Sequence, residues 1–123
     1  MDTKRNSARN RRVTAIRVQN DTFRQAVCVT GGLLFGRKVH TVGVEALPRD
    51  VKQDIWRRVA EFDAFSTDND PHGEHDFGAF DHPVAGRIFW KIDYFDPTFR
   101  HGAENPADPS TRRVLTVMLA EEY

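Results

Sequence analysis

The segment 68–76 holds the densest group of side chains that could do chemistry, and it reads Asp-Asn-Asp-Pro-His-Gly-Glu-His-Asp. Imidazole and carboxylate groups are ligands that zinc, manganese and iron accept. A hairpin turn centred between Val84 and Ala85 would place Asp76 opposite Asp93, and two facing carboxylates repel unless a cation or a proton lies between them. The residues predicted to bind a divalent metal are His72, His75, Asp76 and Asp93, with Glu74 as the general base of a metal-dependent hydrolase or nuclease.

The same segment also fits an ordinary loop. Asp68 and Asp70 are typical of turns, in which a short carboxylate accepts hydrogen bonds from nearby backbone N–H groups. A register shifted by one residue would move Asp76 and Asp93 to different faces of the sheet. The loop would then be a recognition surface, and the residues predicted to form that surface are Asp68, Asp70, Glu74, Trp90, Tyr94 and Asp96.

Outside this segment the chain carries little that could react. Trp90 and Tyr94 lie near Arg87 and Lys91 in the sequence, a combination that can stack on single-stranded nucleic acid. The alternation of apolar residues around Trp90 instead favours a place in the core. The sequence has no nucleophile motif, no phosphate-binding glycine loop and no dinucleotide fingerprint, which favours a protein that is not an enzyme.

The elements that must position these residues follow from hydrophobic periodicity. Ile16, Asn20, Phe23 and Val27 share one helical face, and Pro48 opens a second helix with a clear amphipathic stripe. The predicted elements are helices over 13–27 and 48–65 and strands over 37–44, 76–82, 87–95 and 113–119. The order α-β-α-β-β-β predicts an α+β domain in which two helices pack on an antiparallel sheet of about four strands.

Composition places these elements in one domain, since 123 residues leave little room for a second. Residues 1–12 are polar and Arg-rich and are predicted to form a flexible basic tail, which leaves 13–123 as the folded domain. The formal net charge is zero, which argues against a dedicated nucleic-acid binder. The charges are nevertheless segregated: basic residues dominate the N-terminus, and no Lys or Arg lies between Arg58 and Arg87.

The sequence also predicts where the protein resides. Cys28 is the only cysteine, so no disulfide can form within the chain and a reducing compartment is expected. The N-terminus lacks the apolar segment of a secretory signal, and no apolar run approaches the roughly 20 residues of a membrane span. A cytoplasmic protein without membrane contact is therefore expected.

Several stretches resemble a bacterial family known only as a domain of unknown function. The most specific are Asn-Asp-Pro-His-Gly-Glu-His-Asp-Phe-Gly at 69–78, Phe-Trp-Lys-Ile-Asp-Tyr-Phe-Asp at 89–96 and Arg-Val-Leu-Thr-Val-Met-Leu at 113–119. The segment 20–24 is similar to the family's N-terminal helix. The resemblance implies no catalytic residues, because the family has no established activity. It implies a context of plasmids and other mobile elements, in which small inhibitors of host defence occur.

Three functional hypotheses follow. The first is a small non-enzymatic module that binds another protein, in particular an anti-restriction or anti-CRISPR inhibitor of a bacterial defence complex. The second is the metal-dependent hydrolase or nuclease described above. The third is a nucleic-acid-binding accessory protein that uses the basic N-terminal arm, with an affinity that falls steeply with salt.

Overall fold

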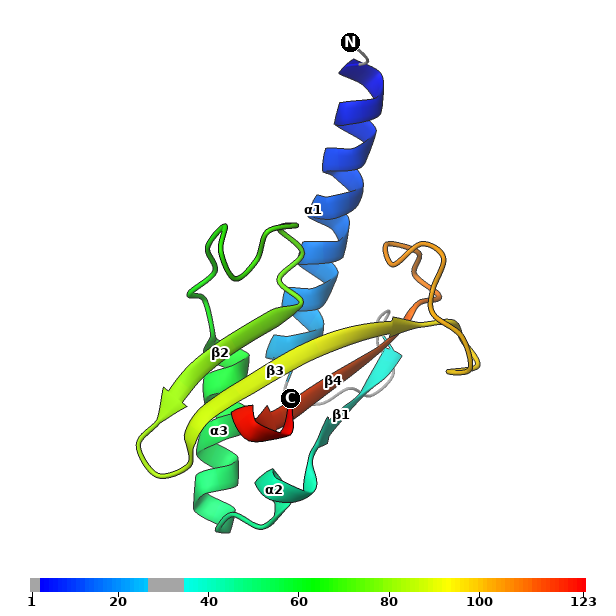
Figure 1. The fold of residues 1–123 in the computed structure, drawn as a ribbon. Coiled ribbons are helices and arrows are strands. Elements are labelled where there is room, and N and C mark those ends of the chain that lie inside the picture. The colour runs from blue at the N-terminus through cyan, green and yellow to red at the C-terminus, as the bar shows by residue number, and fades with distance from the viewer. Residues whose placement is uncertain (1–2, 27–34) are drawn as a thin grey trace.

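The computed structural model describes residues 3–26 and 35–123 and shows a four-stranded sheet with its two long helices on one face (Figure 1). Among the described residues, no helix is long and apolar enough to cross a bilayer. The elements in chain order are α1 (Thr3–Gln25), β1 (Phe35–His40), α2 (Val42–Glu45), α3 (Arg49–Glu61), β2 (Phe77–His82), β3 (Gly86–Phe95), β4 (Arg112–Leu119) and the 3-10 helix η1 (Ala120–Glu122).

This architecture confirms the predicted α+β class and its element order, to which the structure adds the short helices α2 and η1. The sheet order is β1-β4-β3-β2. β2 pairs with β3 and β3 pairs with β4 in antiparallel fashion. The prediction of an antiparallel sheet was wrong for β1, which runs parallel to β4. The sheet is therefore mixed, with β1 and β2 at its two edges.

Helix α1 begins at Thr3, ten residues before the start predicted from periodicity. Its predicted packing face is confirmed, because Ile16, Asn20 and Phe23 are all buried. The first turns lack an apolar stripe but are rich in Arg, which favours helix. Figure 1 shows this N-terminal part extending beyond the sheet. The helix ends at Gln25, and Val27, the last residue of the predicted helix, and Cys28 lie outside the described residues.

Helix α3 covers the sheet beside α1, as its stripe predicts. Val51, Ile55 and Val59 are buried and belong to the hydrophobic core, which is completed by apolar side chains from β3 and β4. The helix ends at Glu61, four residues before the predicted end, and Phe62 adopts an extended backbone. That change of direction carries Phe62 and Phe65 onto the core as separate aromatic contacts.

Trp90 lies at the centre of this core with no exposed surface. Phe62 and Phe65 contact its ring edge-on, at centroid distances of 5.6 and 6.1 Å. On the neighbouring strand Gly78 pairs with Trp90, and a Cβ at Gly78 would lie only 2.3 Å from the indole Nε1. A glycine at position 78 is therefore what lets the indole lie flat against β2.

Candidate functional site

The acidic loop between α3 and β2 is fastened to α1 through its backbone. The Arg17 guanidinium donates to the carbonyl of Gly73 at 3.2 Å, and the Asn20 amide donates to the carbonyl of Glu74 at 2.9 Å. Gly73 has a φ of 71°, a conformation that glycine adopts at little cost. The loop's path is thus set by donors on a helix distant in sequence.

His75 lies inside this loop, with each ring nitrogen facing a carboxylate. Its Nδ1 lies 3.0 Å from an oxygen of Asp21 on α1, and its Nε2 lies 3.6 Å from Asp70. The ring stacks on Phe65 at a centroid distance of 3.7 Å. Asp70 is also buried and accepts a hydrogen bond from the His75 backbone N–H. These contacts hold His75 in a left-handed backbone conformation with a φ of 56°, which is uncommon for a residue other than glycine.

A second group of buried polar side chains centres on Asn20, which has no exposed surface. Its amide nitrogen donates to the Tyr94 hydroxyl at 2.8 Å, and its carbonyl oxygen accepts from Arg113 Nε at 2.7 Å. Tyr94 in turn donates to Glu74 at 3.1 Å. Burial raises the pKa of the Tyr94 hydroxyl and lowers the pKa of the Arg113 guanidinium. This network ties α1, the acidic loop and strands β3 and β4 together.

The expected pairing of Asp76 with Asp93 was wrong by one residue. The observed register pairs Phe77 with Lys91 and His82 with Gly86, so Asp76 and Asp93 occupy positions of opposite parity and point to different faces of the sheet. Asp76 is half-buried on the helix side, where burial, followed by the charges of Glu74 and Asp70, raises the pKa of its carboxyl.

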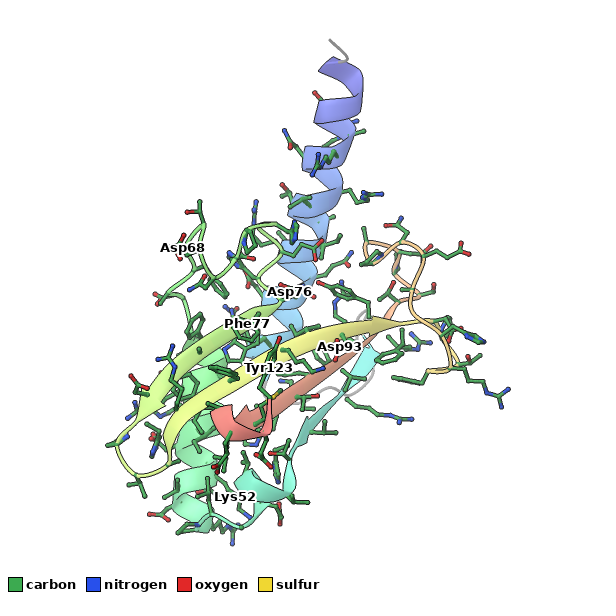
Figure 2. All side chains as sticks on the ribbon, in the orientation of Figure 1. Lys52, Asp68, Asp76, Phe77, Asp93 and Tyr123 are labelled. Atoms are coloured by element: carbon green, nitrogen blue, oxygen red, sulfur yellow. The ribbon has the colours of Figure 1, made fainter. Side chains whose placement is uncertain are left out.

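The predicted metal ligands consequently do not converge on one point. Asp93 forms an ion pair with Lys91 at 3.0 Å on the other face of the sheet, and His72 is exposed in the loop. Within residues 3–26 and 35–123, no three His, Cys, Asp or Glu side chains are grouped closely enough to hold a metal ion. Figure 2 shows Asp76 and Asp93 as separate positions along the sheet.

The residues predicted as a binding surface divide into exposed and internal ones. Asp68 is exposed at the loop tip. Asp96 accepts hydrogen bonds from the backbone and hydroxyl of Thr98, and the hydroxyl hydrogen bond is the main reason why the pKa of the Asp96 carboxyl is lowered. Asp70, Glu74, Trp90 and Tyr94 are engaged in the internal contacts described above. The acidic loop therefore exposes fewer carboxylates than its sequence suggests.

The structure presents a different surface, the side of the sheet that faces away from α1 and α3 (Figure 1). We call it the open face. The alternation along each strand assigns its members, because the opposite parity packs against the helices. The strand residues of the open face are Arg37, Val39, Phe77, Ala79, Asp81, Arg87, Phe89, Lys91, Asp93, Phe95, Arg112, Val114, Thr116 and Met118.

Aromatic rings gather on the open face around the C-terminal residue. Phe77 and Phe89 lie 5.5 Å apart between ring centroids. Tyr123, carried onto this side of the sheet by η1, packs against both rings at 6.0 and 5.4 Å. Figure 2 shows Phe77 and Tyr123 on the near side of the sheet, and the Tyr123 residue is 74% exposed.

A second aromatic pair lies at the other end of the open face. Phe95, at the end of β3, lies 6.4 Å from Phe99 in the following loop. The Arg37 guanidinium, from the edge strand β1, lies 4.2 Å from the Phe99 ring centroid, within the range of a cation–π interaction. Val39 continues the apolar surface along β1 and is 41% exposed.

Sequence reasoning missed the inward-facing charges that organise the site, namely Asp21, Arg24 and Arg113. One signal was present for Arg113, because it shares strand parity with Leu115 and Val117 and therefore falls on the buried face. Arg24 is also buried and donates to the carbonyls of Val59 and Ala60 at the end of α3. Nothing local in the sequence marks that contact, because its partners are backbone groups on another helix.

Comparison with known proteins places this arrangement within a family. No curated protein and no solved structure matches the chain. The family profile described as "Protein of unknown function (DUF3768)" matches residues 40–122, which extend from the end of β1 into η1 and make up more than half of the chain. The chain therefore belongs to the DUF3768 family of proteins of unknown function.

Proposed function

We propose that this protein is a non-enzymatic interaction module that binds another protein through the open face. The observation that carries the proposal is the aromatic cluster of Phe77, Phe89 and Tyr123 on a sheet face that neither α1 nor α3 covers. Large apolar side chains on an exposed surface mark interaction sites in folded proteins.

The composition of the open face supports a protein partner. Protein interfaces are enriched in aromatic residues, Met and Arg and depleted of charged residues at their centres. The open face carries Phe77, Phe89 and Tyr123 as one aromatic cluster, and its acidic side chains lie beside bases: Asp93 pairs with Lys91, and Asp81 pairs with Arg87. Aromatic anchors surrounded by a polar rim are typical of binding hot spots.

The acidic loop supports the hydrolase alternative less well. Its most chemically capable side chain, His75, is stacked on Phe65 and directed by both ring nitrogens toward Asp21 and Asp70. As a metal ligand, the role predicted for it, His75 would need one ring nitrogen free to bind the ion, and Glu74, the predicted general base, accepts a hydrogen bond from Tyr94. The contacts of His75 instead favour a role in fixing the loop.

The family resemblance suggests which partner to test first. Small proteins with this kind of sequence are expected to accompany mobile elements, so the proposed partner is a bacterial defence complex of the restriction or CRISPR type. This part of the proposal rests on the resemblance alone, whereas the location of the binding surface rests on the geometry of the open face.

The test is an affinity capture from bacterial lysate with the tagged full-length protein and matched variants. Val39→Glu places a charge on the open face, and Tyr123→Ala removes the most exposed ring of the cluster. Val84→Ser is the control, because Val84 is 69% exposed but lies at the hairpin tip. We expect one stoichiometric partner to be retained by the wild type and by the control, and its affinity for either face variant to fall roughly tenfold or more, equivalent to about 1.4 kcal/mol. Equal capture by all four proteins would refute the assignment of the surface.

A further inference from the structure

We infer that the N-terminal part of α1, residues 3–12, is a second binding site, which binds the phosphate backbone of a nucleic-acid duplex. We call this segment the basic arm. It lies apart from the open face and reaches beyond the sheet (Figure 1). It also lies outside residues 40–122, which match the family profile.

Charge segregation is the first argument. Six of the eighteen basic residues lie within 3–20, a stretch without Asp or Glu, and only one acidic residue precedes residue 21. From residue 21 onward the chain therefore carries twelve basic and seventeen acidic residues. The overall neutrality conceals a positive helix attached to a negative body. A concentrated positive field of this kind attracts polyanions, even when the net charge of the protein is zero.

The spacing along α1 is the second argument. Ile16, Asn20 and Phe23 form the stripe that packs on the sheet. Continued toward the N-terminus with the same intervals of three and four residues, this stripe reaches Arg12 and then Arg9. This side of α1 packs on the sheet at Ile16 and Phe23, and it carries basic residues where the helix extends beyond the sheet.

Exposure is the third argument, because residues 7–12 are all exposed. The contacts of α1 with the loop after α3 lie beyond these residues: Val13 is half-buried beside Gly73, and Arg17 donates to the carbonyl of Gly73. Arg9, Arg11 and Arg12 thus extend from a helix that is already ordered, and binding does not have to order the backbone first. An ordered segment avoids the entropy cost that a disordered one pays on binding.

The dimensions and composition of the arm favour a duplex over a membrane. Ten helical residues span about 15 Å, and the major groove of DNA, about 12 Å wide, admits an α-helix. A helix that lies in a membrane surface needs a broad apolar face as well as basic residues. Between Thr3 and Arg12 the only apolar side chain is Ala8, so the arm has no such face.

The test measures the binding of full-length protein to a fluorescein-labelled 20-base-pair DNA duplex by fluorescence anisotropy, at NaCl concentrations between about 50 and 200 mM. The arm variant is Arg9→Gln/Arg11→Gln/Arg12→Gln. Glutamine preserves helix propensity, and circular dichroism checks that the fold is retained. The logarithm of the binding constant falls with the logarithm of salt by about 0.9 for each phosphate contact. Losing three contacts should reduce that slope by about 2.7 and weaken binding at low salt by about tenfold or more.

The matched control is Arg49→Gln/Arg57→Gln/Arg100→Gln, which removes the same charge from three exposed positions outside the arm and the open face. We expect this variant to bind the duplex with nearly the wild-type salt slope. Equal losses in the two triple variants would assign the affinity to net charge and overturn the proposal. Absence of wild-type binding at low salt, or tighter binding to vesicles that contain phosphatidylserine than to the duplex, would also overturn it.

Discussion

Replacing Asn20 with alanine should destabilise the folded protein by about 3–5 kcal/mol. The substitution removes an acceptor 2.7 Å from the buried Arg113 guanidinium and a donor 2.9 Å from the carbonyl of Glu74. A buried polar group that loses its partner costs about 1–3 kcal/mol, and a charged one costs more. Tyr94 loses one hydrogen bond but keeps its bond to Glu74. For a chain of this size, the loss corresponds to a fall in melting temperature of about 10–20 °C.

The assay is urea denaturation followed by circular dichroism, and Asn105→Ala serves as the control. Asn105 is exposed, and its side chain caps only the backbone N–H of Ala107, so its replacement should cost about 1 kcal/mol or less. The double variant Asn20→Ala/Arg113→Met should be less destabilised than the two single variants combined, by about 0.5–3 kcal/mol. Equal losses for Asn20→Ala and Asn105→Ala, together with simple additivity in the double variant, would refute the view that this network holds the acidic loop in place.

Two further predictions concern Gly78 and Asp76, which lie on the side of the sheet that the helices cover. Gly78→Ala should lower the free energy of unfolding by about 1–3 kcal/mol, because the new Cβ would lie 2.3 Å from the buried Trp90 ring. Gly102→Ala is the control: the nearest neighbour of its new Cβ would be 3.8 Å away, so it should have little effect in thermal melts. Asp76→Asn should melt higher than the wild type near pH 7. Burial and Glu74 raise the folded-state pKa of the Asp76 carboxyl, so its charged form destabilises the folded protein above that pKa. The difference in melting temperature between Asp76→Asn and the wild type should therefore shrink as the pH falls and the wild-type carboxyl becomes protonated. A constant difference across the pH range would contradict this assignment.

Local patterns predicted most of the regular structure. The stripe of Val51, Ile55 and Val59 identified α3 because its period matches a helix. The alternation of Ile88 and Trp90 identified β3 and its buried face, since β-strand side chains alternate between faces. These signals are contained within a single element, so the sequence alone carries them.

The candidate site was harder to predict from the sequence, because it depends on strand register and on how the helices and strands pack together. The hairpin register shifted by one residue because the turn uses three residues between His82 and Gly86. Gly86 has a φ of 80°, as three-residue hairpin loops often require, and His82 Nδ1 accepts the N–H groups of Val84 and Ala85. That shift alone separated the two carboxylates on which the predicted metal site depended.

Contacts between segments that are far apart in the chain could not be predicted from the sequence for the same reason. The parallel pairing of β1 with β4 joins residues such as Val39 and Thr116, and no local pattern specifies a partner so distant in the chain. The open face emerged only once that pairing and the position of Tyr123 were known. The acidic loop stood out in the sequence because its polar residues are adjacent, yet His75 and Asp70 turn inward.

Site-specific photocrosslinking in bacterial cells tests the central claim most directly. A benzoylphenylalanine residue replaces Tyr123 or Val39 on the open face, or Val84 at the hairpin tip as the control. We expect one discrete adduct with another protein, formed from positions 123 and 39 and not from 84. No adduct from the open face, an adduct formed equally from all three positions, or only an adduct at twice the 14.1 kDa mass of the chain would contradict the proposal that this face binds another protein.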